Sequence, residues 1–143
     1  MIGNPGRGKT HMAIGIGLKA CAGGKSVLFK NAASLSTELS EAKDNYALGK
    51  LEKRIQKVDL LIIDEMGYVS FDRFQSELLF KVIADRSERG STIVTTNLAF
   101  SEWTNLFENT AIVAALVDRL TFRSYILDMN GDSYRLDHSK NGA

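Results

Sequence analysis

The chain has 143 residues, and its apolar content of 44% is enough for a packed core, which excludes a wholly disordered protein. Its 18 basic and 17 acidic residues leave a net charge of +1, which excludes a strongly basic nucleic-acid coat protein but leaves room for a local basic patch. The single cysteine excludes an internal disulfide framework and a zinc site built from clustered cysteines.

No apolar run in the sequence reaches the about 18–20 residues that a membrane-spanning helix needs. The first residues also lack the charged-then-apolar pattern of a signal segment. We therefore expect no membrane partner and a cytoplasmic location, which the single cysteine fits.

The first half of the chain alternates between patterns typical of helices and of strands. It predicts helices over residues 9–22, 34–42 and 48–58 and a strand over residues 26–30. The pair Gly23-Gly24 ends the first helix. One face of the last helix carries apolar residues at three- and four-residue spacing, namely Leu48, Leu51, Ile55 and Val58.

The second half continues the alternation. It predicts strands over residues 60–63, 91–96 and 125–129 and helices over residues 74–89 and 111–120. The first of these strands is continuously apolar, which is typical of a strand buried on both faces in a parallel sheet. Because strands and helices alternate throughout, we expect an α/β layered fold with a mostly parallel sheet.

A glycine-rich loop stands directly ahead of the first predicted helix. Residues 3–10 read GNPGRGKT and match the phosphate-binding pattern G-x-x-x-x-G-K-[ST] at every fixed position. Glycines let backbone N–H groups approach phosphate oxygens, and the following helix directs its partially positive end at the anion. The alternative is a glycine-rich turn that happens to precede a helix. The predicted nucleotide-binding residues are Gly3, Asn4, Pro5, Gly6, Arg7, Gly8, Lys9, Thr10 and His11.

Within this loop, Lys9 is predicted to reach the β- and γ-phosphates and Thr10 to offer its hydroxyl to Mg²⁺. Two carboxylates, Asp64 and Glu65, follow the buried strand directly. A buried unpaired charge is costly, so their place needs a reason. We interpret them as a Walker B motif, in which Asp64 holds the Mg²⁺ shell through water and Glu65 orients and deprotonates the attacking water. The alternative is a pair of solvated carboxylates that end a strand.

A further polar residue, Asn97, ends the strand over residues 91–96. Ligands of parallel sheets bind beyond the carboxyl ends of the strands, so Asn97 is expected to lie beside Glu65. It could hydrogen-bond the water or the γ-phosphate. Asparagine is also common in ordinary turns, and position alone does not decide between the two roles.

Four segments of the chain together resemble IstB-like ATP-binding proteins. They read GNPGRGKTH, VDLLIIDEMGY, ELLFKVIADRSERGSTIVTTNLAFSEW and, near the end, VDRL followed by ILDMNGDSYR. These proteins are the transposition helper ATPases of insertion sequences and relatives of the DnaC helicase loader within the AAA+ group. The resemblance extends over residues 1–136 and is more specific than the two phosphate-site motifs, which many unrelated ATPases share.

The resemblance implies a three-layer P-loop NTPase fold of the AAA+ or RecA-like type, as one domain over residues 1–143. It implies ATP and Mg²⁺ as cofactors, ATP hydrolysis, and a helper role in DNA transposition. The partners would be double-stranded DNA, a transposase and further copies of the same chain. The alternatives are a DnaC-like loader that uses ATP as a conformational switch in DNA replication, and an inactive truncated remnant.

The resemblance also assigns roles to single residues. Asn97 becomes the sensor of the γ-phosphate, and Arg119 becomes the arginine that reaches the ATP of a neighbouring subunit, a task that suits a guanidinium. Arg123 could share that role, and a solvated helix-end charge is the alternative for both arginines. Arg135 matches a late motif without a clear contact to nucleotide. His11 fits the GKTH pattern, although packing or hydrogen bonding is its more ordinary role.

One predicted helix carries a basic face that could contact DNA phosphates. Its residues are Lys50, Lys53, Arg54 and Lys57, opposite the apolar face. Two further basic residues, Arg86 and Arg89, flank the end of the next predicted helix. An ordinary solvated helix face explains the same pattern, and the near-neutral net charge speaks against strong DNA binding by this segment alone.

The loop motif begins at residue 3, which leaves only Met1 and Ile2 of the strand that feeds such a loop. In the AAA+ arrangement this strand lies between the strand before Asn97 and the last strand. We therefore expect an N-terminally truncated core that lacks most of its first strand and the DNA-binding region ahead of it. Unpaired strand edges are expected to make such a chain poorly stable and weakly active.

Overall fold

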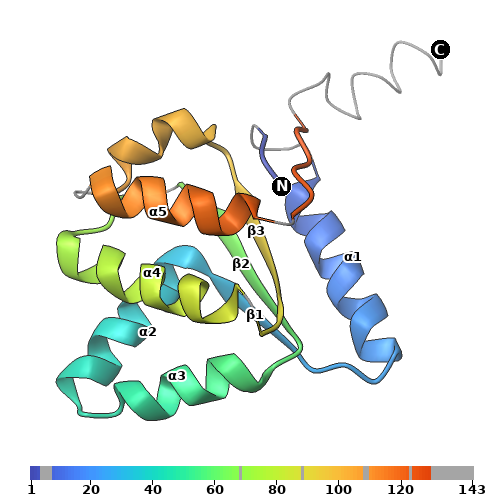
Figure 1. The fold of residues 1–143 in the computed structure, drawn as a ribbon. Helices are drawn as coiled ribbons and strands as arrows, with labels where there is room; N and C mark the ends of the chain where they lie inside the picture. The colour runs from blue at the N-terminus through green and yellow to red at the C-terminus, as the bar shows by residue number, and fades with distance from the viewer. Residues whose placement is uncertain (4–7, 68, 88, 108–109, 123, 130–143) are drawn as a thin grey trace.

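The computed structural model describes residues 1–3, 8–67, 69–87, 89–107, 110–122 and 124–129. Helices and strands alternate along the chain, as predicted (Figure 1). The elements are α1 Lys9–Ala22, β1 Val27–Asn31, α2 Ala32–Asp44, α3 Leu48–Lys57, β2 Leu60–Met66, α4 Arg73–Arg86, β3 Ser91–Thr96, the 3₁₀ helix η1 Phe100–Asn105 and α5 Thr110–Thr121. The short helix η1 is the one element among these that the sequence pattern did not predict.

Three parallel strands form the sheet in the order β1-β2-β3. Leu60 at the start of the central strand β2 pairs with Val27 on one side and Ser91 on the other. Helix α1 lies on one face of the sheet, and α2, α3, α4 and α5 lie on the other (Figure 1). This arrangement confirms the predicted three-layer α/β fold with a parallel sheet.

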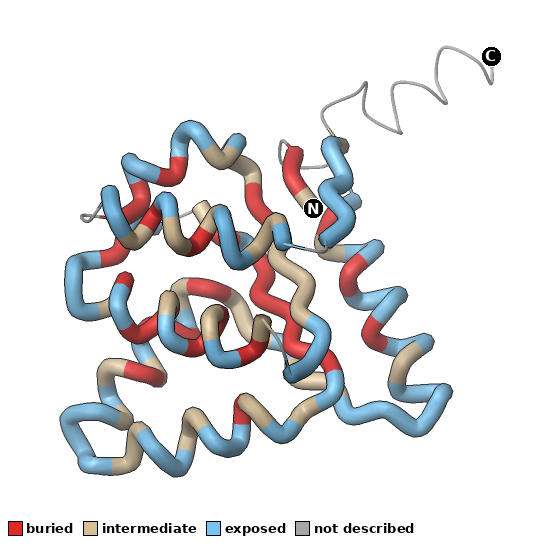
Figure 2. Tube along the Cα trace, viewed as in Figure 1, coloured by how far each residue is buried: buried red, intermediate tan, exposed pale blue. Residues whose placement is uncertain are grey.

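The central strand β2 is buried along nearly its whole length, as its apolar sequence predicts (Figure 2). Its side chains alternate between the two faces of the sheet. Leu61 and Ile63 join the large core beneath α2, α4 and α5, whereas Leu60 and Ile62 pack against Ala13 of α1. The strand therefore packs against both helical layers. Its last residues lie at one edge of the sheet.

Side-chain caps set two helix starts. Asn31 accepts hydrogen bonds from the backbone N–H groups of Ala33 at 3.0 Å and Ser34 at 3.4 Å, so α2 begins two residues earlier than predicted. Asp72 and Gln75 form a reciprocal capping box at the start of α4. These caps satisfy backbone N–H groups that have no partner inside the helix.

The first residues of the chain lie beside β3 as the end of a further parallel strand. Ile2 forms parallel bridges with Thr96 on one side and Asp128 on the other. Its backbone N–H also donates to the Leu127 carbonyl at 2.9 Å. The expected position of this segment, between β3 and the last part of the sheet, is confirmed.

The predicted strand over residues 125–129 does not form as a strand. Among the described residues of this segment, Asp128 alone makes a bridge, and the side chains of Tyr125, Ile126 and Leu127 are exposed. A strand needs a partner along its length, and here residues 1–3 supply a partner at one end. The prediction was wrong because periodicity reports an extended apolar segment and not the presence of its neighbour.

Residues of β3 and of this last segment line a cavity of about 700 Å³. Apolar residues from the sheet, α5 and the chain start line much of it, including Met1, Ile93, Val94, Leu120 and Leu127. Phe122 and Ile126, which also line it, are more than half exposed.

None of the described helices is long and apolar enough to cross a membrane.

Arg86, at the end of α4, is buried inside the fold and is not on a DNA-facing surface, which corrects the reading of its sequence position. Its guanidinium makes five hydrogen bonds, four of them to backbone carbonyls. Two of these carbonyls, from Ile55 at 2.9 Å and Val58 at 3.0 Å, belong to the end of α3. Burial lowers the pKa of Arg86, and the charge of Asp59 opposes that shift. Arg86 thus joins α3, α4 and the start of β3.

We expect Arg86→Met to lower the free energy of unfolding by about 3 kcal/mol, because it leaves buried carbonyls without donors. Urea denaturation followed by circular dichroism measures this loss. Arg89→Met is the matched control, since Arg89 is exposed and its loss should change stability by less than about 0.5 kcal/mol. Equal stability of the two variants would contradict the structural role of Arg86.

Candidate functional site

The start of α1 lies at the edge of the sheet where the strands end. Gly8 adopts a left-handed backbone with φ of 79°, and the following residue, Lys9, is buried with 9% of its surface exposed. Burial, and then the charge of Lys9, lower the pKa of the Met1 amino group. The cationic head of α1 therefore gives this edge a positive character suited to an anion.

The predicted metal residues meet at this edge. The Thr10 hydroxyl donates to the Asp64 carboxylate, 3.1 Å from each oxygen. Asp64 is 3% exposed and also accepts a hydrogen bond from the Thr95 hydroxyl. A loop-side hydroxyl and a strand-end carboxylate, 54 positions apart in sequence, thus lie in direct contact, as the two motifs predict.

These oxygens fit a magnesium ion. Within the described part of the chain, no group of three or more His, Cys, Asp or Glu side chains could hold a metal by itself. Mg²⁺ does not require such a group, because one or two protein oxygens suffice when phosphate and water complete the shell. Thr10 and Asp64 provide that number of oxygen atoms at one place.

Glu65 lies next to this pair in an unusual backbone conformation. Its φ is 61°, in the left-handed region, and the register between β2 and β3 shifts at this point. Such a conformation costs about 1–3 kcal/mol in a residue other than glycine and is found at functional sites. Glu65 is exposed, whereas Asp64 is buried. The two carboxylates are therefore set up for different tasks.

Asn31, at the end of β1, holds the Glu65 carboxylate. Its amide Nδ2 donates to Glu65 Oε2 at 2.6 Å, and its Oδ1 is occupied by the cap of α2. Sequence reasoning missed Asn31. The signal was available, because a polar residue at the end of the strand over residues 26–30 is the same kind of evidence that singled out Asn97.

Asn97 lies just beyond β3, against the turn that follows β2. Its Oδ1 is buried and has no hydrogen-bond partner among the described residues. This atom rests on Gly67, which has φ of 126°, and an added Cβ at Gly67 would fall directly on it. Gly67, without a side chain, thus leaves the space that the Asn97 amide oxygen occupies.

We expect Gly67→Ala to lower the free energy of unfolding by about 1–3 kcal/mol, since alanine is strained at this φ and its Cβ displaces Asn97. Urea denaturation followed by circular dichroism measures this loss. Gly49→Ala in α3 is the matched control, because a Cβ there meets open space and alanine favours helix by about 1 kcal/mol. A wild-type free energy of unfolding in Gly67→Ala would contradict this account of the contact between Gly67 and Asn97.

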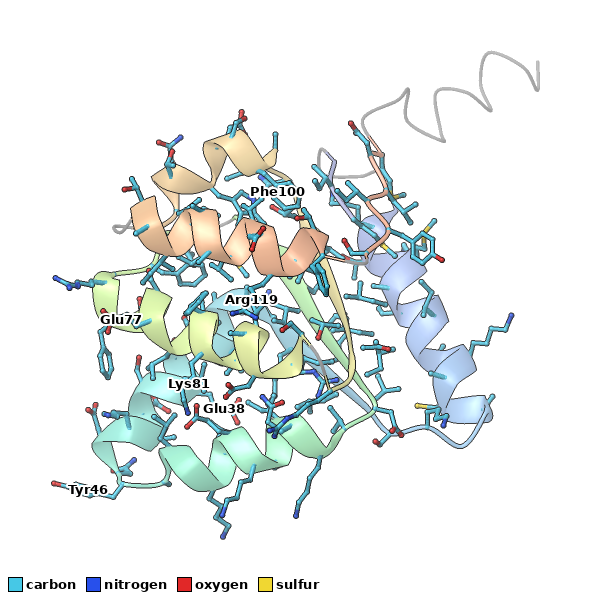
Figure 3. All side chains as sticks on the ribbon, viewed as in Figure 1. Glu38, Tyr46, Glu77, Lys81, Phe100 and Arg119 are labelled. Carbon is cyan, nitrogen blue, oxygen red and sulfur yellow. The ribbon has the colours of Figure 1, made fainter. Side chains whose placement is uncertain are left out.

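The other predicted site residues take no part in the contact between Thr10 and Asp64 or lie outside the described residues. Arg119 is exposed in the last turn of α5 and lines the cavity beside β3 (Figure 3). His11 is exposed on α1, and Gly3 is buried where residues 1–3 leave β3. The predictions for Asn4, Pro5, Gly6, Arg7, Arg123 and Arg135 lie outside the described residues.

The chain is similar to known proteins along nearly its whole length. The family model described as IstB-like ATP binding protein matches residues 1–142. The insertion sequence IS5376 ATP-binding protein of Geobacillus stearothermophilus is 42% identical over 138 residues, which cover 94% of this chain and 54% of the relative. The insertion sequence IS21 ATP-binding protein of Pseudomonas aeruginosa is 36% identical over 140 residues, which cover 98% of this chain and 53% of the relative. The chain thus spans about half the length of these relatives.

Solved structures share the fold. AMPPCP-bound DnaA from Aquifex aeolicus matches 99% of this chain and 43% of its own, with a TM-score of 0.79 and 16% identity. The match to the DnaC helicase loader covers 82% of this chain and 72% of the loader, with a TM-score of 0.69 and 23% identity. At these identities the similarity establishes a fold of the AAA+ P-loop type.

Proposed function

Because this chain belongs to the IstB-like ATP-binding protein family, we propose that it binds ATP with Mg²⁺ and hydrolyses it as a helper in DNA transposition. The observation that carries the proposal is the contact between Thr10 at the head of α1 and Asp64 at the end of β2. A turn that merely resembled a phosphate loop would not need a buried carboxylate beside it.

Each residue at this edge has a role that its surroundings support. Lys9 pairs with the phosphates, and Thr10 and Asp64 hold Mg²⁺. Bound by these two residues, Mg²⁺ would supply positive charge that neutralises the phosphates. At the head of α1, the backbone N–H groups that follow Gly8 would face the phosphates.

Glu65 acts on the attacking water. Its exposed carboxylate would orient a water molecule and accept its proton as the water oxygen bonds to the γ-phosphorus and the bond from that phosphorus to the bridging oxygen of the ADP leaving group breaks. Asn31 is a positioning residue that holds this carboxylate at 2.6 Å, and Asn97 donates from its amide to the γ-phosphate. The acid–base residue and the metal ligand are thus neighbours in sequence with opposite burial.

Arg119 supplies a positive charge to the ATP of a neighbouring copy. It is exposed in the last turn of α5 and lines the cavity beside β3. A guanidinium suits this task because its fork of donors matches phosphate oxygens. ATP would therefore join copies of this chain into a homo-oligomer.

Mixing two inactive variants tests this arrangement. Arg119→Ala keeps an intact ATP site but lacks the arginine, whereas Lys9→Ala keeps the arginine but lacks ATP. We expect each variant alone to be inactive and the mixture to regain part of the turnover, measured as phosphate release. Full activity of Arg119→Ala alone, or no recovery in the mixture, would contradict the role in a neighbouring site.

Double-stranded DNA is the proposed surface on which the copies assemble, and a transposase is the proposed partner. The basic face of α3, formed by Lys50, Lys53, Arg54 and Lys57, is exposed, and Ile55 on the opposite face is buried. Such a face contacts phosphates without reading bases. Steady-state ATP turnover with and without duplex DNA tests the proposal. Stimulation by DNA supports the helper role, and ATP binding without turnover would favour a nucleotide switch.

A further inference from the structure

Thr95, the second-last residue of β3, connects the two carboxylates at the sheet edge. It is 1% exposed, and its hydroxyl donates to Asp64 Oδ1. The same hydroxyl oxygen accepts the backbone N–H of Glu65 at 2.9 Å. One side chain thus contacts the metal-side residue and the backbone of the water-side residue.

The direction of these two hydrogen bonds is determined by chemistry. A backbone N–H can only donate, so the Thr95 oxygen is the acceptor toward Glu65. The hydroxyl has one proton, and the carboxylate of Asp64 is its acceptor. Glu65 lies where the register of the strand shifts and its φ is 61°, so its N–H points to a threonine side chain instead of a regular ladder partner.

We propose that Thr95 is a positioning residue that couples Asp64 to the backbone of Glu65, so that one hydroxyl sets both the metal ligand and the turn that exposes the water-orienting carboxylate. The inference rests on the proposed function, in which Thr10 and Asp64 hold Mg²⁺. When the Thr10 oxygen is a metal ligand, Thr95 is the hydroxyl that still orients Asp64. Side chains that orient metal ligands in this way are functionally costly to remove.

Three variants separate this role from a purely structural one. Thr95→Val keeps the shape of the side chain but removes the hydroxyl, and Thr95→Ser restores it. Thr92→Val is the matched control, because Thr92 lies on the same strand and its hydroxyl accepts from Arg86 at 3.2 Å, away from the carboxylates. Calorimetric titration with a non-hydrolysable ATP analogue, with and without MgCl₂, measures the gain in affinity that Mg²⁺ produces.

We expect Thr95→Val to reduce this magnesium-dependent gain by about 10-fold or more, whereas Thr95→Ser and Thr92→Val retain it. Affinity without Mg²⁺ should stay near that of the wild type. The role of Thr95 alone is overturned if Mg²⁺ raises the affinity of Thr95→Val as much as that of the wild type. It is also overturned if Thr95→Ser loses as much of this magnesium-dependent affinity as Thr95→Val does. A wild-type protein that binds no nucleotide, or gains nothing from Mg²⁺, overturns the proposed function as well.

Hydrogen exchange gives a readout that needs no nucleotide and that begins with the wild-type chain. The Glu65 amide of the wild-type chain should exchange slowly despite its place at a strand irregularity, because Thr95 accepts its hydrogen bond. In Thr95→Val the same amide should exchange faster, while amides in the middle of β2 stay protected. Unprotected exchange of the Glu65 amide in the wild-type chain overturns the proposal even if Thr95→Val fails to fold.

Discussion

Replacement of Glu65 by glutamine is expected to slow ATP turnover by about 10²–10⁴-fold while leaving ATP bound, because the amide cannot accept the proton of the attacking water. The side chain keeps its size and its backbone conformation, and Asn31 can still contact it. Single-turnover phosphate release measures the loss, and a filter-binding assay shows whether nucleotide stays on the protein.

Glu102→Gln is the matched control for this variant. Glu102 lies in η1 and is exposed, so its replacement should leave turnover unchanged. Unchanged turnover in Glu65→Gln would remove the catalytic assignment. Loss of ATP binding together with turnover would show that Glu65 contributes to the nucleotide site and does not act on water alone.

Lys9→Ala is expected to abolish ATP binding. The residue is buried at the head of α1, where its ammonium group and the helix end act on the same anion. Alanine keeps the helix, since it is a good helix former, but removes the charge. Equilibrium titration with ATP should show no saturable binding, while the circular dichroism spectrum stays that of the wild type.

Lys19→Ala is the control on the same helix. Lys19 is exposed in the last turn of α1, three turns away from the phosphate edge, and its replacement should leave ATP affinity unchanged. If Lys9→Ala bound ATP as tightly as the wild type, residues 3–10 would be a glycine-rich turn and not a phosphate-binding loop.

The contact between Thr10 and Asp64 could be predicted from sequence because it follows from topology. A loop that precedes a helix and a strand that ends in carboxylates meet at one edge when the sheet is parallel. The burial of β2 on both faces followed from its continuous apolar run in the same way. Motif and periodicity were therefore sufficient for the fold class and for the centre of the site.

Contacts between side chains of different strands could not be predicted. The bond from Asn31 to Glu65 and the bridge through Thr95 depend on the local register shift that gives Glu65 its φ of 61°. No periodicity reports such a shift. The burial of Arg86 could not be predicted either. A basic residue at a helix end is expected to be solvated, and only the structure shows the backbone carbonyls that surround it.

The segment over residues 125–129 illustrates a third limit. Its composition is that of a strand, but a strand exists only as part of a ladder, and Asp128 alone is bridged, to Ile2. The exposed Tyr125 and Ile126 show how much apolar surface stays uncovered here. Sequence patterns describe what one segment favours, whereas pairing depends on the segment that lies beside it.

The central claim is that Lys9, Thr10 and Asp64 form a site for ATP with Mg²⁺ in this chain. Equilibrium titration of labelled ATP into the purified wild-type chain, with and without MgCl₂, tests it most directly. We predict saturable binding that Mg²⁺ strengthens, because the Thr10 and Asp64 oxygens that now contact each other at 3.1 Å would both serve the metal ion. No saturable binding, or binding that Mg²⁺ leaves unchanged, would contradict the account.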